Sequence, residues 1–96
     1  MTAFVIAHVD VLDPDGYKAY PARNTPLVER FGGRFVARGG RVEMFEGDAP
    51  PNRLVVIEFP SMDAARAWYH SPEYQEIAAI RQQYAHTHLL ALVEGA

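Results

Sequence analysis

The chain has 96 residues, of which 49% are hydrophobic, 22% charged and 11% aromatic, and its formal net charge at pH 7 is −3. This length and composition predict one globular domain over residues 1–96 and exclude a fibrous repeat or a disordered tail. The negative charge argues against binding nucleic acid, and no apolar run is long enough to cross a membrane.

Cysteine is absent, and the chain begins without the basic start and apolar stretch of a signal peptide. The first fact excludes disulfides, thiolate nucleophiles and cysteine metal sites, and both together lead us to expect a cytoplasmic protein. Eight of the nine basic residues are arginine. A codon bias is the simpler explanation for most of them, but arginine also suits sites that hold a carboxylate or phosphate.

The first predicted elements are a strand and an irregular helix. Residues 3–12 carry apolar side chains on both faces of an extended chain, which is typical of a central strand. Asp13 and Pro14 are typical of a helix start, as the cap and the first helical residue. Two internal prolines, Pro21 and Pro26, each remove a backbone hydrogen bond, so we expect this helix to kink or break.

Glycine pairs divide the middle of the chain. Gly32-Gly33 is expected to end the first helix, because glycine adopts the left-handed C-terminal conformation at low cost. Residues 34–38 predict a short strand, and residues 41–46 are expected to be extended again. Gly39-Gly40 between them fits either a hairpin turn or a bulge inside one bent strand, and we favour the bulge.

The second half predicts a strand, two helices and a last strand. Residues 53–59 are the clearest strand, since four of the seven are β-branched or aromatic. Two serine caps, Ser61 and Ser71, are expected to begin helices that run to about His70 and Ala85. Residues 87–94 predict the final strand.

This order of elements predicts a ferredoxin-like α+β fold, a βαββαβ sandwich with helices on one face of an antiparallel sheet. The other face has no cover in a single chain. Residues 3–12, 53–59 and 87–94 are apolar on both faces. We therefore expect the chain to bind a second copy of itself, because a homodimer is the usual way to cover such a surface.

Short motifs along nearly the whole chain resemble one family. The most specific lies within residues 58–75, EFPS followed by WYHSPEYQ, and weaker pieces are GGRF at 32–35, RGG at 38–40 and Arg81. The sequence is similar to the domain of unknown function 1330 family. The resemblance implies a dimeric α+β barrel, in which two ferredoxin-like sheets face each other with the helices outside. Relatives in that superfamily include cofactor-independent quinone-forming monooxygenases, haem-degrading enzymes, small isomerases and proteins of unknown activity.

Three charged residues lie among apolar neighbours and are candidates for a pocket. Arg38 is expected to orient an anionic group and Glu58 to act as its base or acid, and the alternative is a structural ion pair between the two. Arg81 continues a helical stripe with Tyr74, and either points into a cavity or reaches solvent along its own stem. The other arginines that we considered look like ordinary surface residues: Arg41, Arg53 and Arg66.

A histidine and two tyrosines complete the candidate site. His70 is a candidate general base at the end of a helix, although the helix dipole alone would explain a histidine there. Tyr20 and Tyr74 are candidate ligand-binding residues, since tyrosine hydroxyls in a cavity suit a planar phenolic or quinone-like ligand.

Three other histidines raise the question of a metal. His86 and His88 form an H-x-H pair at the start of the last strand, and His8 lies in the neighbouring first strand. Their imidazoles can converge on zinc, copper or iron. Because the H-x-H spacing arises easily by chance, we predict no metal site and no cofactor.

The functional prediction is a small-metabolite enzyme, similar to a cofactor-independent monooxygenase or an isomerase, with a pocket between sheet and helices. The alternatives are a non-catalytic or stress-related module that binds a small ligand in that pocket, and a purely structural dimer. An enzyme predicts a buried glutamate or histidine beside the pocket, a binding module predicts a pocket without one, and a structural dimer predicts no cavity.

Overall fold

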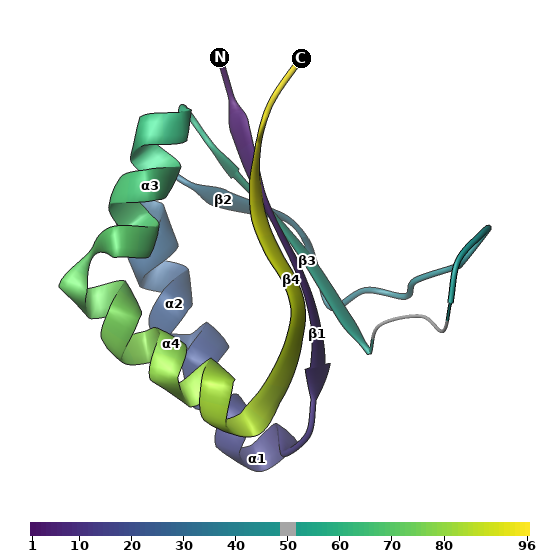
Figure 1. Ribbon diagram of the computed structural model, residues 1–96. Helices are drawn as coiled ribbons and strands as arrows, with labels where there is room; N and C mark the ends of the chain where they lie inside the picture. The colour runs from purple at the N-terminus through teal and green to yellow at the C-terminus, as the bar shows by residue number, and fades with distance from the viewer. Residues whose placement is uncertain (49–51) are drawn as a thin grey trace.

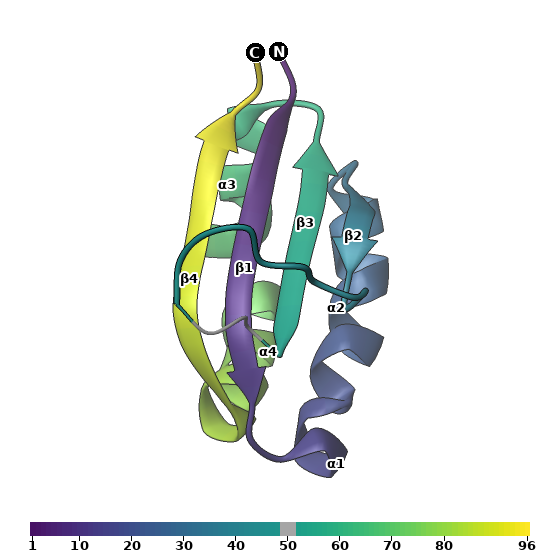
Figure 2. The same cartoon turned by 90° about the vertical axis from the view of Figure 1, so that its right-hand side faces the viewer.

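A computed structural model describes residues 1–48 and 52–96. The elements in chain order are β1 (Ala3–Val11), α1 (Pro14–Tyr17), α2 (Ala19–Arg30), β2 (Arg34–Arg38), β3 (Arg53–Phe59), α3 (Met62–His70), α4 (Pro72–Tyr84) and β4 (Ala85–Glu94). The four strands form one antiparallel sheet in the order β2-β3-β1-β4. The helices cover one face of this sheet, and the opposite face, called here the open face, carries no helix (Figures 1 and 2). The predicted ferredoxin-like α+β fold is confirmed.

The first helical segment is broken, as predicted, but not at a proline. The Asp13 side chain caps α1 by accepting a hydrogen bond from the Gly16 amide. The break falls at Lys18, between α1 and α2. Pro21 lies in the first turn of α2, where its missing amide removes no helical hydrogen bond, and Pro26 is accommodated inside the helix.

The core lies between the helices and the sheet. Its largest fully buried side chains come from α2, α3, α4 and two strands, and they are Trp68, Tyr74, Phe59, Val9 and Val28. Alternation along the strands explains this layer, because every second residue of β3 points toward the helices. Thus Val55, Ile57 and Phe59 are at most 8% exposed, whereas the residues between them are half-buried on the open face.

The prediction of extended structure at residues 41–46 is wrong. β2 ends at Arg38, and Gly39 follows with a φ of +67°. Residues 39–48, called here the arm, contain no strand and stand away from the open face (Figure 1), passing in front of β1 and β4 when that face is viewed directly (Figure 2). Within residues 1–48 and 52–96, β2 is an edge strand paired with β3 alone, so no described strand extends the ladder beyond it. Gly39-Gly40 is therefore neither a hairpin turn nor a bulge.

Candidate functional site

A bulge in β2 directs Arg38 toward the helices. Phe35 pairs with Ile57 and Arg38 pairs with Val55, so β2 has one residue more than β3 between these pairs. In a regular strand Arg38 would face away from Phe35, whereas the extra residue places both on the helix-covered side. There the Arg38 guanidinium carbon lies 4.0 Å from the centre of the Phe35 ring, and Nη1 donates a 2.7 Å hydrogen bond to Thr25.

Arg81 is a buried cation. Its side chain comes from α4 and is 4% exposed. Nη1 donates to the Thr87 hydroxyl and Nε has no partner, and within residues 1–48 and 52–96 no carboxylate pairs with it. Burial acts to lower the pKa of Arg81, but the hydroxyls of Tyr74 and Tyr20 outweigh it and raise that pKa. Arg81 therefore keeps its charge without a counter-ion from the described chain.

Two tyrosine hydroxyls meet beside Arg81. Tyr20 Oη and Tyr74 Oη are 2.7 Å apart in a buried hydrogen bond, and the Arg81 guanidinium carbon lies 5.9 Å from the Tyr20 ring centre. Burial, and then the neighbouring Tyr74 hydroxyl, raise the pKa of Tyr20 well above its ordinary value. The Tyr20 phenol is thus neutral at physiological pH. The pair uses one of its two hydroxyl protons internally, which leaves the second available to an acceptor.

Three arginines line one narrow cavity between α1, α2 and the sheet, called here the arginine cavity. Its volume is about 20 Å³, and its wall contains Arg38, Arg53, Arg81 and Tyr20 but no carboxylate or imidazole among the described residues. That volume holds about one water molecule. The structure therefore brings together Arg38, Arg81 and Tyr20, with Tyr74 hydrogen-bonded behind Tyr20.

Arg53 is a member of this site that the sequence analysis assigned to the surface. It pairs with Val9 at the start of β3, and its buried Nε has no hydrogen-bond partner among the described residues. Its guanidinium carbon lies 5.7 Å from the centre of the Tyr17 ring. A signal for this position was present, because Arg53 shares the alternation of the buried residues Val55 and Ile57.

A wider depression lies at the mouth of the arginine cavity. It has a volume of about 400 Å³, and Tyr17, Pro21 and Arg53 line both spaces. Lys18 adds a further cation to its wall. Outward movement of Tyr17 and Arg53 would join the two spaces, and a ring-sized ligand needs that movement to reach Arg81.

Glu58 lies on the other side of the sheet. It pairs with Phe4 and Arg34 in the ladder, and both Nε and Nη2 of Arg34 contact its Oε1, at 2.9 and 2.6 Å. The predicted meeting of Arg38 and Glu58, as a pocket pair or as an ion pair, is therefore not formed. The cause is geometric, because Glu58 follows the open-face alternation of β3 while the bulge directs Arg38 to the opposite face.

His70 lies outside the arginine cavity. It is exposed at the end of α3, where it lines a separate cavity of about 190 Å³ between α3 and β4. Trp68 contributes to the walls of both cavities. The Trp68 indole donates a 3.0 Å hydrogen bond to the side chain of Asn24, which is 2% exposed. Asn24 is a second residue that the sequence analysis missed, although it lies one helical turn after Tyr20.

The three histidines of β1 and β4 do converge on the open face. The ring centres of His8 and His88 are 4.5 Å apart, and those of His86 and His88 are 4.4 Å apart. His88 Nε2 lies 2.7 Å from Asp10 Oδ2, and this hydrogen bond lowers the pKa of Asp10. These groups are distinct from the arginine cavity, because they lie on the opposite face of the sheet.

Similar solved structures share this fold. RPA0582, a protein of unknown function from Rhodopseudomonas palustris, has 24% identity and a TM-score of 0.74, and the match covers 99% of this chain and 82% of that one. SnoaB, a cofactor-independent oxygenase from Streptomyces nogalater, has 18% identity, coverages of 99% and 93% and a TM-score of 0.68. A dimeric protein of unknown function and ferredoxin-like fold from Bacteroides fragilis has 12% identity, coverages of 98% and 96% and a TM-score of 0.57.

Three further findings bear on the identity of the chain. No curated protein matches the chain. In the described part of the chain, every helix is too short or too polar to cross a bilayer. The model of the family described as "Domain of unknown function (DUF1330)" matches residues 2–96. The chain therefore belongs to the DUF1330 family.

Proposed function

We propose that the arginine cavity binds a small planar aromatic anion, either a carboxylate or a phenolate, and that the protein functions by binding this ligand. The observation that carries this proposal is the set of three arginines, Arg38, Arg53 and Arg81, in a cavity whose described wall holds no acid. Burying a cation without a counter-ion is costly, so an anionic ligand would supply the missing charge. The guanidinium fork suits a carboxylate or phenolate oxygen.

The remaining wall suits an aromatic ring. Tyr20 and Trp68 provide aromatic surface, and the Tyr20–Tyr74 pair keeps one hydroxyl proton for a ligand oxygen. Asn24 adds a polar group at the same wall. Glu58 and His70 have no part in this proposal, because neither side chain lines the cavity. A site without a carboxylate or imidazole base fits a binding protein better than an enzyme that removes a proton from its substrate.

A thermal-shift screen of the whole chain tests the proposal, with salicylate and 1-naphthoate as probes and their neutral amides as controls. We expect the acids to raise Tm and the amides to leave it unchanged. R81M and R38M should each lose the shift. R66M is the matched control, because Arg66 is half-exposed and paired with Asp63 on α3, away from the cavity. A shift that persists in R81M, or the absence of any shift in the wild type, overturns the proposal.

A second candidate function is oxygenation of such a ligand without a cofactor. The fold likeness to the oxygenase SnoaB favours it, and arginines that stabilise a phenolate make the ring electron-rich toward O₂. In the balanced reaction a ring CH₂ becomes C=O with one atom of O₂, and the other atom leaves as water with both hydrogens. An oxygen electrode measures this with a tricyclic phenol that has a reactive CH₂. Uptake that R81M does not reduce excludes this cavity as the site of reaction.

We also propose that two copies pair through their open faces. Exposed apolar side chains lie on that face and on the arm, and the largest are Val36, Met44, Phe45, Leu89 and Val93. Exposed apolar side chains gathered on one face are typical of an interface. The similar Bacteroides fragilis protein is described as dimeric, which supports the same arrangement for this chain.

A further inference from the structure

A second group of polar side chains on the open face lies outside the proposed ligand site. His8 and Asp10 come from β1 and His88 from β4, and one donor atom of each lies within 4.8 Å of the other two. The ring of His86 packs against that of His88, with ring centres 4.4 Å apart. The sequence alone predicted no metal site from the H-x-H spacing, and the structure adds Asp10 and a backbone irregularity to that pattern.

The irregularity is a bulge in β4 that directs His88 to the open face. His8 pairs with Leu89 and the next residue, Val9, pairs with Thr87, so His88 is the extra residue. In a regular strand His88 would face the helices with Leu90, two residues further along. The bulge interrupts the ladder between the first and last strands, and its result is that His88 joins His8 and Asp10.

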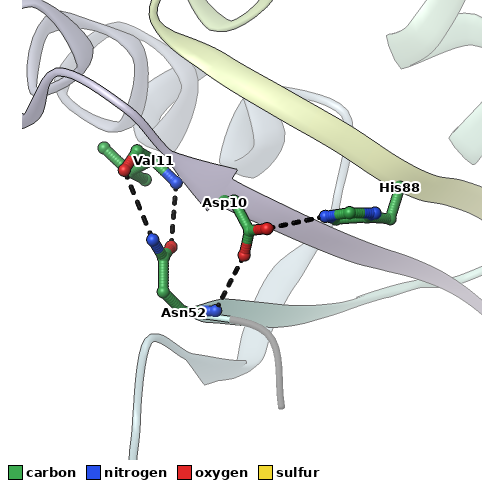
Figure 3. A network of polar contacts seen from close by, with 4 residues as sticks. All are labelled: Asp10, Val11, Asn52 and His88. Atoms are coloured by element: carbon green, nitrogen blue, oxygen red, sulfur yellow. Dashed lines mark hydrogen bonds and ion pairs between the residues drawn. The ribbon is translucent and has the colours of Figure 1, made fainter. Parts of the chain in front are cut away.

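The carboxylate of Asp10 is held in position from its other side. The Asn52 amide donates to Oδ1 over 3.1 Å, while Oδ2 lies 2.7 Å from His88 Nε2. Asn52 is itself fixed, because its side chain accepts from the Val11 amide at 2.8 Å and donates to the Val11 carbonyl at 3.3 Å (Figure 3). Metal ligands are typically oriented by such outer hydrogen bonds.

We propose that His8, Asp10 and His88 bind a divalent first-row transition metal ion, with zinc as the preferred ion. Two imidazoles and one carboxylate are a donor set typical of zinc sites that keep an open position, and imidazole also suits cobalt and nickel. Ligands around a tetrahedral zinc lie about 3.3 Å apart. The donor atoms of the three residues, which lie within 4.8 Å of one another, would therefore move closer together when the ion binds. The ion replaces the proton between His88 and Asp10, and His86, whose ring packs against that of His88, is a candidate for a fourth ligand.

Metal titration of the full-length chain without a histidine tag tests this proposal. After chelation and dialysis, Zn²⁺ is titrated calorimetrically, and Co²⁺ is added as a spectroscopic probe of nitrogen and oxygen ligation. We expect one Zn²⁺ per chain. H8Q and H88Q should each weaken binding at least about ten-fold. N52A keeps the backbone amide that donates to Asp10 but removes the side-chain contacts with Val11 that fix its position, so it should weaken binding less than the ligand variants do.

The matched control is H70Q, which removes an exposed histidine on the opposite side of the sheet and should bind Zn²⁺ as the wild type does. Circular dichroism and Tm of each metal-free variant show whether it folds. D10N keeps the size of the side chain and serves as a second ligand variant if a histidine variant unfolds. Failure of the wild type to bind Zn²⁺ stoichiometrically overturns the proposal, and so does binding that H8Q, H88Q and D10N leave unchanged. In those cases the cluster is only a histidine–aspartate hydrogen bond.

Discussion

The hydroxyl pair of Tyr20 and Tyr74 is a buried polar contact beside the proposed ligand site. Replacing one tyrosine by phenylalanine leaves the other hydroxyl buried without its partner. Replacing both removes both hydroxyls, so neither is left unpaired. We therefore expect Y20F and Y74F each to lower the free energy of unfolding by about 1–2 kcal/mol, and Y20F/Y74F to lower it by less than their sum. Urea unfolding of the four proteins measures this, and strictly additive losses would contradict the 2.7 Å contact.

Arg81 offers a prediction of the opposite sign. Its guanidinium is buried, and its only hydrogen bond to the described residues is to Thr87. Replacing an unpaired buried charge by an apolar residue of similar length is often neutral or stabilising. R81M should thus unfold at the same temperature as the wild type or higher, while losing the ligand-dependent shift. A fall in Tm of several degrees would assign Arg81 a structural role instead.

How far the site could be predicted depended on local backbone regularity. Arg81, Tyr20 and Tyr74 lie on helices whose spacing is regular, and the structure places all three together. Glu58 follows the alternation of β3, which already separated it from Val55 and Ile57. The face on which Arg38 lies could not be predicted in this way, because the bulge that directs it to the helices occurs at Val36, where the sequence has no glycine to mark it. A one-residue irregularity reverses the face of every later side chain in a strand.

At the scale of elements, the chain carried its own start and stop signals. Asp13, Ser61 and Ser71 cap the helices as predicted, each accepting a hydrogen bond from an amide three residues later. Gly32 has a φ of +83° at the end of α2, where glycine was expected. The prediction for the arm was wrong, because residues 41–46 carry side chains compatible with a strand but pair with no strand in the described part of the chain. Local propensity cannot supply a missing partner.

The connection between α2 and β2 has no room for a side chain at Gly33. A Cβ atom at Gly33 would lie 2.7 Å from Phe59 Cε1 and 2.8 Å from Val28 Cγ1, and both side chains are fully buried. We expect G33A to lower the free energy of unfolding by roughly 1–3 kcal/mol through overpacking. G40A is the matched control, because among the described residues no atom beyond its chain neighbours lies within 4 Å of its added Cβ. Equal effects of the two substitutions in urea unfolding would contradict this packing.

The start of α4 predicts a pH-dependent stability. The pKa of Glu73 is lowered below its ordinary value of 4.5. The main cause is a hydrogen bond from the backbone amide of Glu73 to its own carboxylate, and the second is the Arg30 guanidinium, 2.6 Å away. A lowered folded-state pKa stabilises the fold above about pH 4.5, and this contribution disappears as the pH falls through the folded-state pKa. E73Q should therefore have a lower Tm than the wild type at pH 6, and the difference should vanish in acid.

The matched variant for this experiment is E76Q on the same helix. Glu76 lies in the second turn of α4, where the helix dipole is weaker, and its contact with Arg23 is longer, at 3.4 Å. We expect a smaller loss of Tm for E76Q than for E73Q at pH 6. A Tm difference between E73Q and wild type that stays constant from pH 6 to strong acid would contradict the assignment.

The whole molecule has two unlike faces. The helices bury one face of the sheet, whereas the open face carries half-buried apolar residues in the centre, such as Ile6 and Val56, and exposed ones toward its edge. The arm stands off this face (Figure 1) and carries Phe45, which is 91% exposed. The described part of a single chain offers no cover for the exposed apolar side chains Met44 and Phe45 of the arm, or for the apolar residues of the open face. A second copy, seated on the sheet and touched by the arm, explains both.

Sedimentation velocity tests this pairing directly. We expect the wild type to sediment as a dimer at micromolar concentration, and I6K to sediment as a monomer because it places a charge at the centre of the open face. F45S removes an apolar side chain of the arm but places no charge in the interface. We therefore expect it to weaken the dimer less than I6K does. A67K adds the same charge on an exposed position of α3 and should remain dimeric. A monomeric wild type, or an I6K variant that folds and stays dimeric, would place the second copy elsewhere. If I6K unfolds, F45S and A67K are compared over a range of protein concentrations, since neither side chain belongs to the core. F45S should dissociate to monomer at a higher concentration than A67K does, and equal dissociation of the two would contradict the pairing.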